Sequence, residues 1–148
     1  YYARARNLLK CARVVVADHA GRLPETEAEL LKLPGIGPYT AAAISAIAFG
    51  QRTVVVDANI ERVVSRLFAI SMPLPQSKPL IRDAMDSITP ASRAGDFAQA
   101  MMDLGAGICS VRAPSCHLCP LAFACDVKRL GNPEAYPAKM PKAAPCLQ

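Results

Sequence analysis

Two sets of reactive side chains stand out in this chain. The first is four cysteines with the spacing C-x6-C-x2-C-x5-C, namely Cys109, Cys116, Cys119 and Cys125. Thiolates are soft ligands, and four of them suit either a zinc ion or a [4Fe–4S] cluster. Zinc sites usually present two close cysteine pairs, whereas only the middle two cysteines form such a pair here. The spacing therefore favours iron–sulfur over zinc.

The second is a single carboxylate, Asp57, which follows the apolar run Val54-Val55-Val56 and begins a helical pattern. An Asp at a helix start is commonly an N-cap, because its side-chain oxygen accepts a hydrogen bond from the first turn. A fixed carboxylate can also stabilise positive charge that develops in a transition state. Taken alone, the residues around Asp57 allow both roles.

A glycine-rich turn precedes this carboxylate by about twenty residues. Pro34, Gly35, Ile36 and Gly37 cannot continue a helix, because two glycines and a proline stand within four residues. Both glycines permit positive φ and close approach of a partner, and Pro38 suits the first turn of a following helix. The segments on both sides have helical patterns, so we predict a helix–hairpin–helix whose outward amides bind a backbone phosphate.

The remaining elements are predicted to be helices, so that the fold class is all-α. The chain is 52% apolar and rich in alanine, which favours helix over sheet. Thr26 and Glu29 form a capping box at the start of a short helix, and Asp96 is expected to cap the last long helix. Residues 51–56 are expected to form a buried extended connector. The expected helices cover 1–19, 26–32, 38–49, 57–68, 77–87 and 96–104, and Gly50 is expected to end the third of them.

The apolar and cationic positions of these helices suggest which faces are buried. In the first helix we expect an inward face of Leu8, Leu9, Ala12, Val15 and Val16. Its cations, Arg4, Arg6, Lys10 and Arg13, either face solvent or contact DNA. Arg62 and Arg66 are spaced i, i+4 and are expected to form a cationic stripe, at the surface or facing phosphate. The net charge of +5 agrees with an acidic partner, but only weakly.

The hairpin Leu33–Thr40, the segment Val56-Asp57-Ala58-Asn59 and the cysteine loop together resemble the helix–hairpin–helix DNA glycosylases of the endonuclease III branch. Tyr1-Tyr2-Ala3-Arg4 and the tail motif Tyr136-Pro137-x-Lys139-x-Pro141-Lys142 resemble the adenine DNA glycosylases, the MutY type, within that branch. The motifs occur in the family's order and the likeness covers nearly all of the 148 residues. This resemblance implies a partial glycosylase fold, an incomplete six-helix barrel, with an iron–sulfur loop.

The resemblance also implies the roles of individual residues. Asp57 would stabilise the oxocarbenium ion formed when the glycosidic bond breaks, with Tyr39 and Asn59 orienting the carboxylate and the nucleophile. Pro34, Gly35, Ile36, Gly37 and Arg112 would contact double-stranded DNA containing a mismatched or damaged base. The four cysteines of the loop would hold a [4Fe–4S] cluster.

The implied reaction is base-excision repair, the removal of adenine mispaired with 8-oxoguanine or guanine. Tyr39 stands where bifunctional family members have their Schiff-base lysine, so the resemblance implies a monofunctional enzyme. The family's general-acid glutamate has no match among the residues Glu25, Glu27, Glu29, Glu61 and Glu134. We therefore expect the 148 residues alone to have little or no activity.

Three other functions remain open. One is an endonuclease III-type glycosylase and abasic-site lyase acting on oxidised pyrimidines. Another is a non-catalytic DNA-binding module that uses the hairpin and the cluster only for docking. The third is an electron-transfer iron–sulfur protein, which gives no reason for the glycine hairpin.

The expected organisation is one helical domain, 1–105, which contains the helix–hairpin–helix at about 26–49. The iron–sulfur loop follows at 106–130, and an extended linker at 131–148. The chain begins with tyrosine and is expected to be a piece of a longer protein. No apolar run is long enough to span a bilayer, and clustered cysteines favour a reducing compartment. We expect an intracellular monomer with no membrane partner, in the cytoplasm or nucleoid if the source is bacterial.

Overall fold

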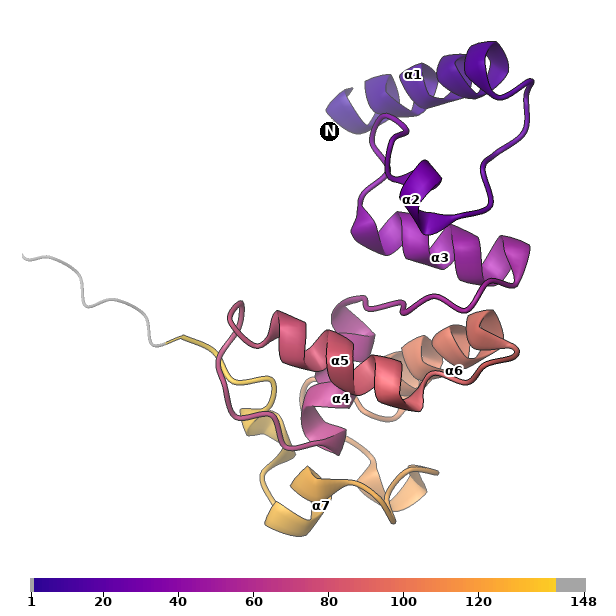
Figure 1. Ribbon diagram of the computed structural model, residues 1–148. Helices are drawn as coiled ribbons and strands as arrows, with labels where there is room; N and C mark the ends of the chain where they lie inside the picture. The colour runs from indigo at the N-terminus through magenta and orange to yellow at the C-terminus, as the bar shows by residue number, and fades with distance from the viewer. Residues whose placement is uncertain (1, 141–148) are drawn as a thin grey trace, which may run out of the picture. The chain divides into compact units, whose positions relative to one another are not determined.

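The computed structural model describes residues 2–140, and this part of the chain is helical (Figure 1). It contains no β-strand between residues 2 and 140, only an isolated bridge between Leu74 and Lys139. The predicted all-α class is confirmed. The α-helices are α1 (Tyr2–Asp18), α2 (Glu27–Leu30), α3 (Pro38–Phe49), α4 (Ala58–Leu67), α5 (Lys78–Ile88), α6 (Ala94–Gly107) and α7 (Asp126–Leu130), and the 3₁₀ helices are η1 (Cys116–Leu118) and η2 (Pro133–Ala135).

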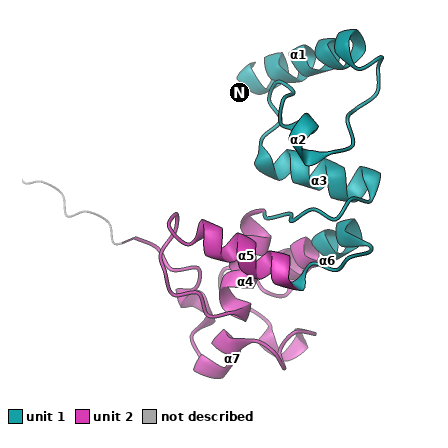
Figure 2. Ribbon diagram, in the orientation of Figure 1, with its two compact units in different colours: residues 1–56, 88–100 teal, residues 57–87, 101–148 magenta. Residues whose placement is uncertain are grey.

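The chain forms two compact units (Figure 2). Unit 1 comprises residues 1–56 and 88–100, and unit 2 comprises residues 57–87 and 101–148. The break falls between Val56 and Asp57, and helix α6 contributes residues to both units. The expected domains 1–105, 106–130 and 131–148 stay predictions. No described helix is long and apolar enough to cross a membrane.

Unit 1 is built around the hairpin that joins α2 and α3. Its apolar core consists of Cys11, Leu30, Leu33 and Ala41, with Val14, Val15, Ile36 and Ile44 packed against it. The expected inward face of α1 is largely wrong: Leu8, Leu9 and Val16 are 72%, 54% and 70% exposed. Helix α1 packs on this core through Cys11, Val14 and Val15, and the apolar residues on its other sides remain exposed.

The ends of α2 and α3 follow their predicted capping signals. The Thr26 hydroxyl accepts a hydrogen bond from the Glu29 amide at 3.4 Å and donates one to the Glu29 carboxylate at 2.8 Å. The N-cap bond is worth about 1 kcal/mol. The second half of the predicted capping box differs, because the Glu29 carboxylate binds the Thr26 hydroxyl and not the Thr26 backbone N–H. At the other end, Gly50 caps α3 in the left-handed conformation, with φ of 66°.

The connector after α3 is extended and partly buried, as predicted. Val54 and Val55 are 8% and 1% exposed, although no strand among the described residues pairs with them. Side chains next to them form the polar contacts instead: Thr53 donates to the Ala42 carbonyl at 2.8 Å, and Arg52 donates to the Thr89 carbonyl at 3.2 Å. These bonds fix the segment that leads to Asp57.

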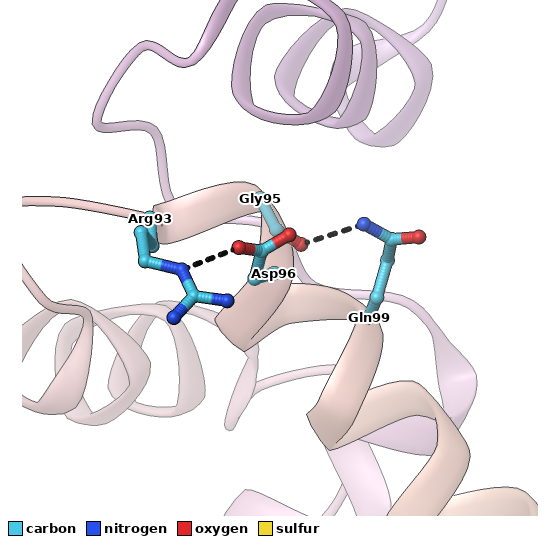
Figure 3. Close-up of polar contacts among 4 residues, drawn as sticks. All are labelled: Arg93, Gly95, Asp96 and Gln99. Carbon is cyan, nitrogen blue, oxygen red and sulfur yellow. Dashed lines mark hydrogen bonds and ion pairs between the residues drawn. The ribbon is translucent and has the colours of Figure 1, made fainter.

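The first turn of α6 differs from the prediction, because the helix begins at Ala94 and Asp96 lies inside its first turn. Figure 3 shows the contacts: Arg93 pairs with Asp96 at 2.7 Å, and Gln99 donates to the Gly95 carbonyl at 3.2 Å. Gly95 is required by space, since a Cβ there would lie 2.5 Å from the Ala46 carbonyl oxygen. Within unit 1, α6 therefore packs directly on the backbone of α3.

Unit 2 has α4 at its centre, with most of this helix buried. Its core is formed by buried aliphatic side chains of α4, α5, α6 and α7, namely Ile60, Val63, Val64, Ile81, Met85, Met101 and Val127. The described part of the segment expected to be a linker is attached to this unit, because the Leu74 amide donates to the Ala138 carbonyl at 3.0 Å. Residues 141–148, including Cys146 and part of the tail motif, lie outside the described residues, as does Tyr1.

Candidate functional site

The hairpin of unit 1 owes its shape to one glycine in particular. Gly35 has φ of +77°, and a Cβ there would lie 2.7 Å from the Cβ of Asn7 on α1. Gly35 is therefore required both by its backbone conformation and by close packing within the protein. Leu33 is buried and Ile36 packs on the core beside it. The turn between α2 and α3 is thus held in place from inside unit 1.

Gly37 is a different case. It is the N-cap of α3 with φ of −91°, a conformation open to any residue, and a Cβ added there would meet nothing within 4 Å. Neither φ nor internal packing explains a glycine here. No side chain caps this end of α3, and Pro38 occupies the first turn as predicted. Tyr39, beside it, is 44% exposed.

A groove of about 550 Å³ runs between α1 and the hairpin within unit 1. Its lining includes one cation, Arg4, and no carboxylate; the other lining residues are Asn7, Leu8, Cys11, Pro34, Gly35, Ile36 and Thr40. Of the α1 cations, Arg4 is thus placed beside the hairpin.

In unit 2, Asp57 is the N-cap of α4. One carboxylate oxygen accepts a hydrogen bond from the Ile60 amide at 2.7 Å, and the other accepts one from the Asn59 side-chain amide at 3.3 Å. Asp57 and Asn59 are both half-buried. The capping bond fixes the carboxylate rather than competing with a chemical role, because it orients the second oxygen. Tyr39 belongs to unit 1, so its predicted role beside Asp57 stays a prediction.

The two arginines of α4 are placed otherwise than expected. Arg62 and Arg66 are 8% and 2% exposed, so the predicted surface or phosphate-facing stripe is wrong. The reason is that a guanidinium carries five donors, and here these donors bind backbone carbonyls of residues 105, 109–111 and 136 in buried or partly buried contacts. Spacing and charge alone could not distinguish this arrangement from a solvated face.

Arg62 connects Asn59 with the chain that precedes the cysteine loop. Its Nη2 donates to the Asn59 Oδ1 at 3.0 Å and to the Gly105 carbonyl at 2.6 Å, while its Nε donates to the Cys109 carbonyl at 2.8 Å. Asn59 in turn donates to Asp57. A continuous hydrogen-bonded series therefore runs from Cys109 through Arg62 and Asn59 to the carboxylate of Asp57.

Arg66 binds the beginning of the cysteine loop. Its guanidinium donates to the carbonyls of Cys109, Ser110, Val111 and Tyr136 at 3.2, 2.7, 3.1 and 3.1 Å. It also donates to the Cys109 sulfur at 3.3 Å. Each of these donors binds a carbonyl or a sulfur, so Arg66 places its guanidinium directly against Cys109.

The four cysteines line one small cavity of about 30 Å³, together with Arg66, Ile108, Ala122, Lys128 and Pro133. Burial raises the pKa of the Cys119 thiol, and the three other thiols raise it further, although a backbone hydrogen bond at Leu121 opposes them. All four sulfurs are therefore close enough to interact. Within residues 2–140 no group of three or more His, Cys, Asp or Glu side chains is arranged to hold a single metal ion. A [4Fe–4S] cluster does not need that convergence, because each of its four cysteines binds a different iron.

The rest of the loop is fixed by contacts that sequence reasoning missed. The Glu134 carboxylate accepts a hydrogen bond from the Ala113 amide at 2.8 Å, and Ser110 donates to the Arg112 carbonyl at 2.8 Å. Asp126 and Arg129 form an ion pair within α7. The side chain of Arg112 is exposed, which agrees with its predicted DNA contact without testing it.

Comparison with known proteins shows which family this chain belongs to. Residues 18–47 match the model of the helix-hairpin-helix motif. The chain is 43% identical to an adenine DNA glycosylase of Arabidopsis thaliana over 98% of its length, and 44% identical to one of Homo sapiens over 87%. The chain belongs to the helix–hairpin–helix DNA glycosylases. The predicted resemblance is therefore confirmed.

Other members of this superfamily are also similar. A thymine/uracil-DNA glycosylase of Methanothermobacter thermautotrophicus is 37% identical over 83% of the chain and 56% of the relative. A solved thermostable thymine-DNA glycosylase matches with a TM-score of 0.75 and 36% identity, over 85% of this chain and 58% of that one. Endonuclease III in a non-covalent DNA complex matches with a TM-score of 0.72 and 29% identity, over 87% and 59%. The chain spans only 24% of the length of the Arabidopsis and human relatives.

Proposed function

We propose that this chain is the part of a monofunctional adenine DNA glycosylase that carries the catalytic carboxylate, the DNA-binding hairpin and the iron–sulfur loop. The observation that supports this most is the state of Asp57. Its carboxylate is held by the first turn of α4 and by Asn59, in a chain 43–44% identical to adenine DNA glycosylases of a plant and a mammal. The substrate is duplex DNA with adenine opposite 8-oxoguanine or guanine.

In the proposed reaction the adenine nucleotide leaves the base stack, as it must for an enzyme to reach its glycosidic bond. Breaking that bond leaves positive charge on the sugar. Asp57 is pre-oriented by its two hydrogen bonds, so it stabilises this charge without rearrangement in the transition state. Tyr39 offers no amine for an imine, and strand cleavage by that route is not expected.

DNA binding is assigned to the hairpin residues Pro34, Gly35, Ile36 and Gly37, with Arg112 as a further contact. The open space around position 37, where a Cβ would meet no other atom within 4 Å, agrees with a phosphate approaching the backbone there. Helix N-termini favour such anions, and these contacts hold the duplex in register without reading its sequence.

The cofactor is proposed to be a [4Fe–4S] cluster held by Cys109, Cys116, Cys119 and Cys125. When bound, such a cluster ties the loop into one rigid unit, as structural metals do. The shared cavity of the four sulfurs and the Arg66 contact to Cys109 fit this group. A purified chain is expected to be brown, whereas a colourless preparation loaded with zinc would contradict the cluster.

The test uses a chimaera in which this chain replaces the matching segment of the Arabidopsis relative. We expect the chimaera to excise adenine opposite 8-oxoguanine under single-turnover conditions, and the 148 residues alone to show little excision because no matching general-acid glutamate is present. A folded chimaera that does not excise adenine would contradict the proposed activity. Excision by the isolated chain that is lost on Asp57→Asn would contradict the expected inactivity of the 148 residues alone.

A second candidate is a glycosylase for thymine or uracil, favoured by the 37% identity to the Methanothermobacter thymine/uracil-DNA glycosylase. The same chimaera, assayed on duplexes with thymine or uracil opposite guanine, distinguishes the two. Borohydride trapping on abasic DNA tests a lyase activity as well. A covalent adduct would support the endonuclease III-type alternative and contradict the monofunctional proposal.

A further inference from the structure

Two glycines close to each other on α6 have very different surroundings. Gly105 is buried, and a Cβ there would lie 2.8 Å from the Cβ of Asn59, 3.1 Å from its carbonyl oxygen and 3.2 Å from its carbonyl carbon. Its φ is not in the positive range, so space and not backbone conformation requires a glycine. Gly107 is exposed, and a Cβ there would meet nothing within 4 Å.

The contact at Gly105 involves the backbone of Asn59 and not only a flexible side chain. A methyl group at position 105 cannot be accommodated by rotation of Asn59, because its tightest contact is with Cβ and the next two are with main-chain atoms. The carbonyl of Gly105 also accepts the 2.6 Å bond from Arg62, whose same nitrogen binds the Asn59 side chain. Gly105 thus packs directly against Asn59 and is also linked to it by hydrogen bonds through Arg62.

Asn59 lies in the first turn of α4, which also holds Asp57. The Asn59 amide donates to one carboxylate oxygen of Asp57, and the next residue, Ile60, donates its backbone N–H to the other. A shift of the Asn59 backbone therefore moves both donors of the carboxylate together. A misplacement of about 1 Å can lower the rate by about 100-fold for a group that must face a reacting atom.

We propose that Gly105 is a positioning residue for the Asp57 carboxylate: its missing side chain allows α6 to set the place of Asn59 and hence of both hydrogen bonds to Asp57. This inference rests on the proposed glycosylase function. Gly105 itself touches neither substrate nor cofactor in this account. Its effect passes entirely through Asn59.

The test compares Gly105→Ala with Gly107→Ala in the chimaera described above. We expect Gly105→Ala to lower the single-turnover rate of adenine excision by about 10- to 100-fold. Its affinity for a duplex with an uncleavable adenine analogue should stay within about twofold of the unsubstituted chimaera. Gly107→Ala, on the same helix, should leave both quantities within about twofold. Equal rates for the two variants would overturn the proposal.

A double-mutant cycle shows whether the effect passes through Asn59, because coupled residues are non-additive. Asn59→Gly removes the tightest contact and the bond to Asp57, and leaves only the 3.1 and 3.2 Å contacts with the main chain. Adding Gly105→Ala to Asn59→Gly should therefore lower the rate by a clearly smaller factor than Gly105→Ala does alone. A full, multiplicative loss would overturn the proposal. If Gly105→Ala alone does not fold, the double variant should recover folding, and its failure to do so would also count against the contact.

A readout without catalysis separates this inference from the proposed function. In the chain itself, the NMR chemical shift of the Ile60 amide proton reports its bond to Asp57. We expect that shift to move in Gly105→Ala and to remain in place in Gly107→Ala. If the chimaera is inactive but the Ile60 amide shift still differs between Gly105→Ala and Gly107→Ala, the proposed function is contradicted and the positioning role is not. An unmoved Ile60 amide in folded Gly105→Ala would overturn the positioning role.

Discussion

The hairpin of unit 1 and the start of the cysteine loop in unit 2 are both irregular segments, but they are fixed in different ways. The hairpin is held by apolar packing of Leu33 and Ile36 and by the close approach of Gly35 to Asn7. Residues 109–111 are held by two buried arginines that bind their carbonyls. The first segment depends on shape and the second on polar donors, so substitutions should affect them differently.

The largest effect on stability is expected from Arg66→Met. This change removes five donated hydrogen bonds, although the Cys109 carbonyl keeps its bond from Arg62. The other carbonyls are in partly buried contacts, and each one left without a partner costs about 1–3 kcal/mol unless water replaces the donor. We expect a loss of about 3 kcal/mol or more in unfolding free energy, together with loss of the visible absorbance of the proposed iron–sulfur cluster. Calorimetry measures the stability, and absorbance spectroscopy measures the cluster content. Unchanged stability and colour would show that the loop does not depend on Arg66.

Gly35→Ala should have the next largest effect, through the hairpin alone. Its φ of +77° and the 2.7 Å contact with Asn7 both penalise a side chain, and the left-handed conformation alone costs about 1–2 kcal/mol. Chemical denaturation should show a loss of at least that size, while the iron–sulfur absorbance stays unchanged. A loss of cluster without loss of stability would contradict the separation of the two regions.

Gly37→Ala sharpens the comparison, because this glycine has no packing role within unit 1. With φ of −91° and open space around the added Cβ, the unfolding free energy should fall by no more than the roughly 0.5–1 kcal/mol that alanine costs at an N-cap. Affinity for duplex DNA should fall by several-fold if a phosphate approaches this backbone. Fluorescence anisotropy at fixed salt measures the affinity, and unchanged binding would remove Gly37 from the proposed DNA contact.

The smallest effect is expected at the Arg93–Asp96 pair of Figure 3. Its side chains are 81% and 58% exposed, and exposed pairs contribute about 0–1 kcal/mol. Arg93→Ala should therefore shift the melting temperature only slightly. A large shift would mean that this charge pair stabilises the start of α6 more than its exposure indicates.

Much of this arrangement could be predicted from local signals in the sequence. The Thr26 and Gly50 caps, the turn at Gly35 and the role of Asp57 at the start of α4 follow from preferences that act within a few residues. The cysteine spacing likewise indicated a shared site, and the four thiols line one cavity.

What could not be predicted depends on contacts between distant segments. Arg62 and Arg66 look like a surface stripe until the carbonyls of residues 105–111 are known to lie against α4. Gly105 has no local turn signal, because its requirement for a glycine comes from Asn59, far away in the sequence. The spacing of Asn59, Arg62 and Arg66 places all three near one face of α4. A shared polar face of this kind is equally compatible with a solvated helix surface, so it does not by itself identify buried arginines.

The most direct test of the account is Asp57→Asn in the chimaera. Asparagine is as good an N-cap as aspartate, so α4 keeps its start while the negative charge is removed. The account predicts that folding and affinity for an uncleavable duplex are retained, while the single-turnover rate of adenine excision falls by about 100- to 1,000-fold. A folded Asp57→Asn chimaera that excises adenine at the unsubstituted rate would contradict it.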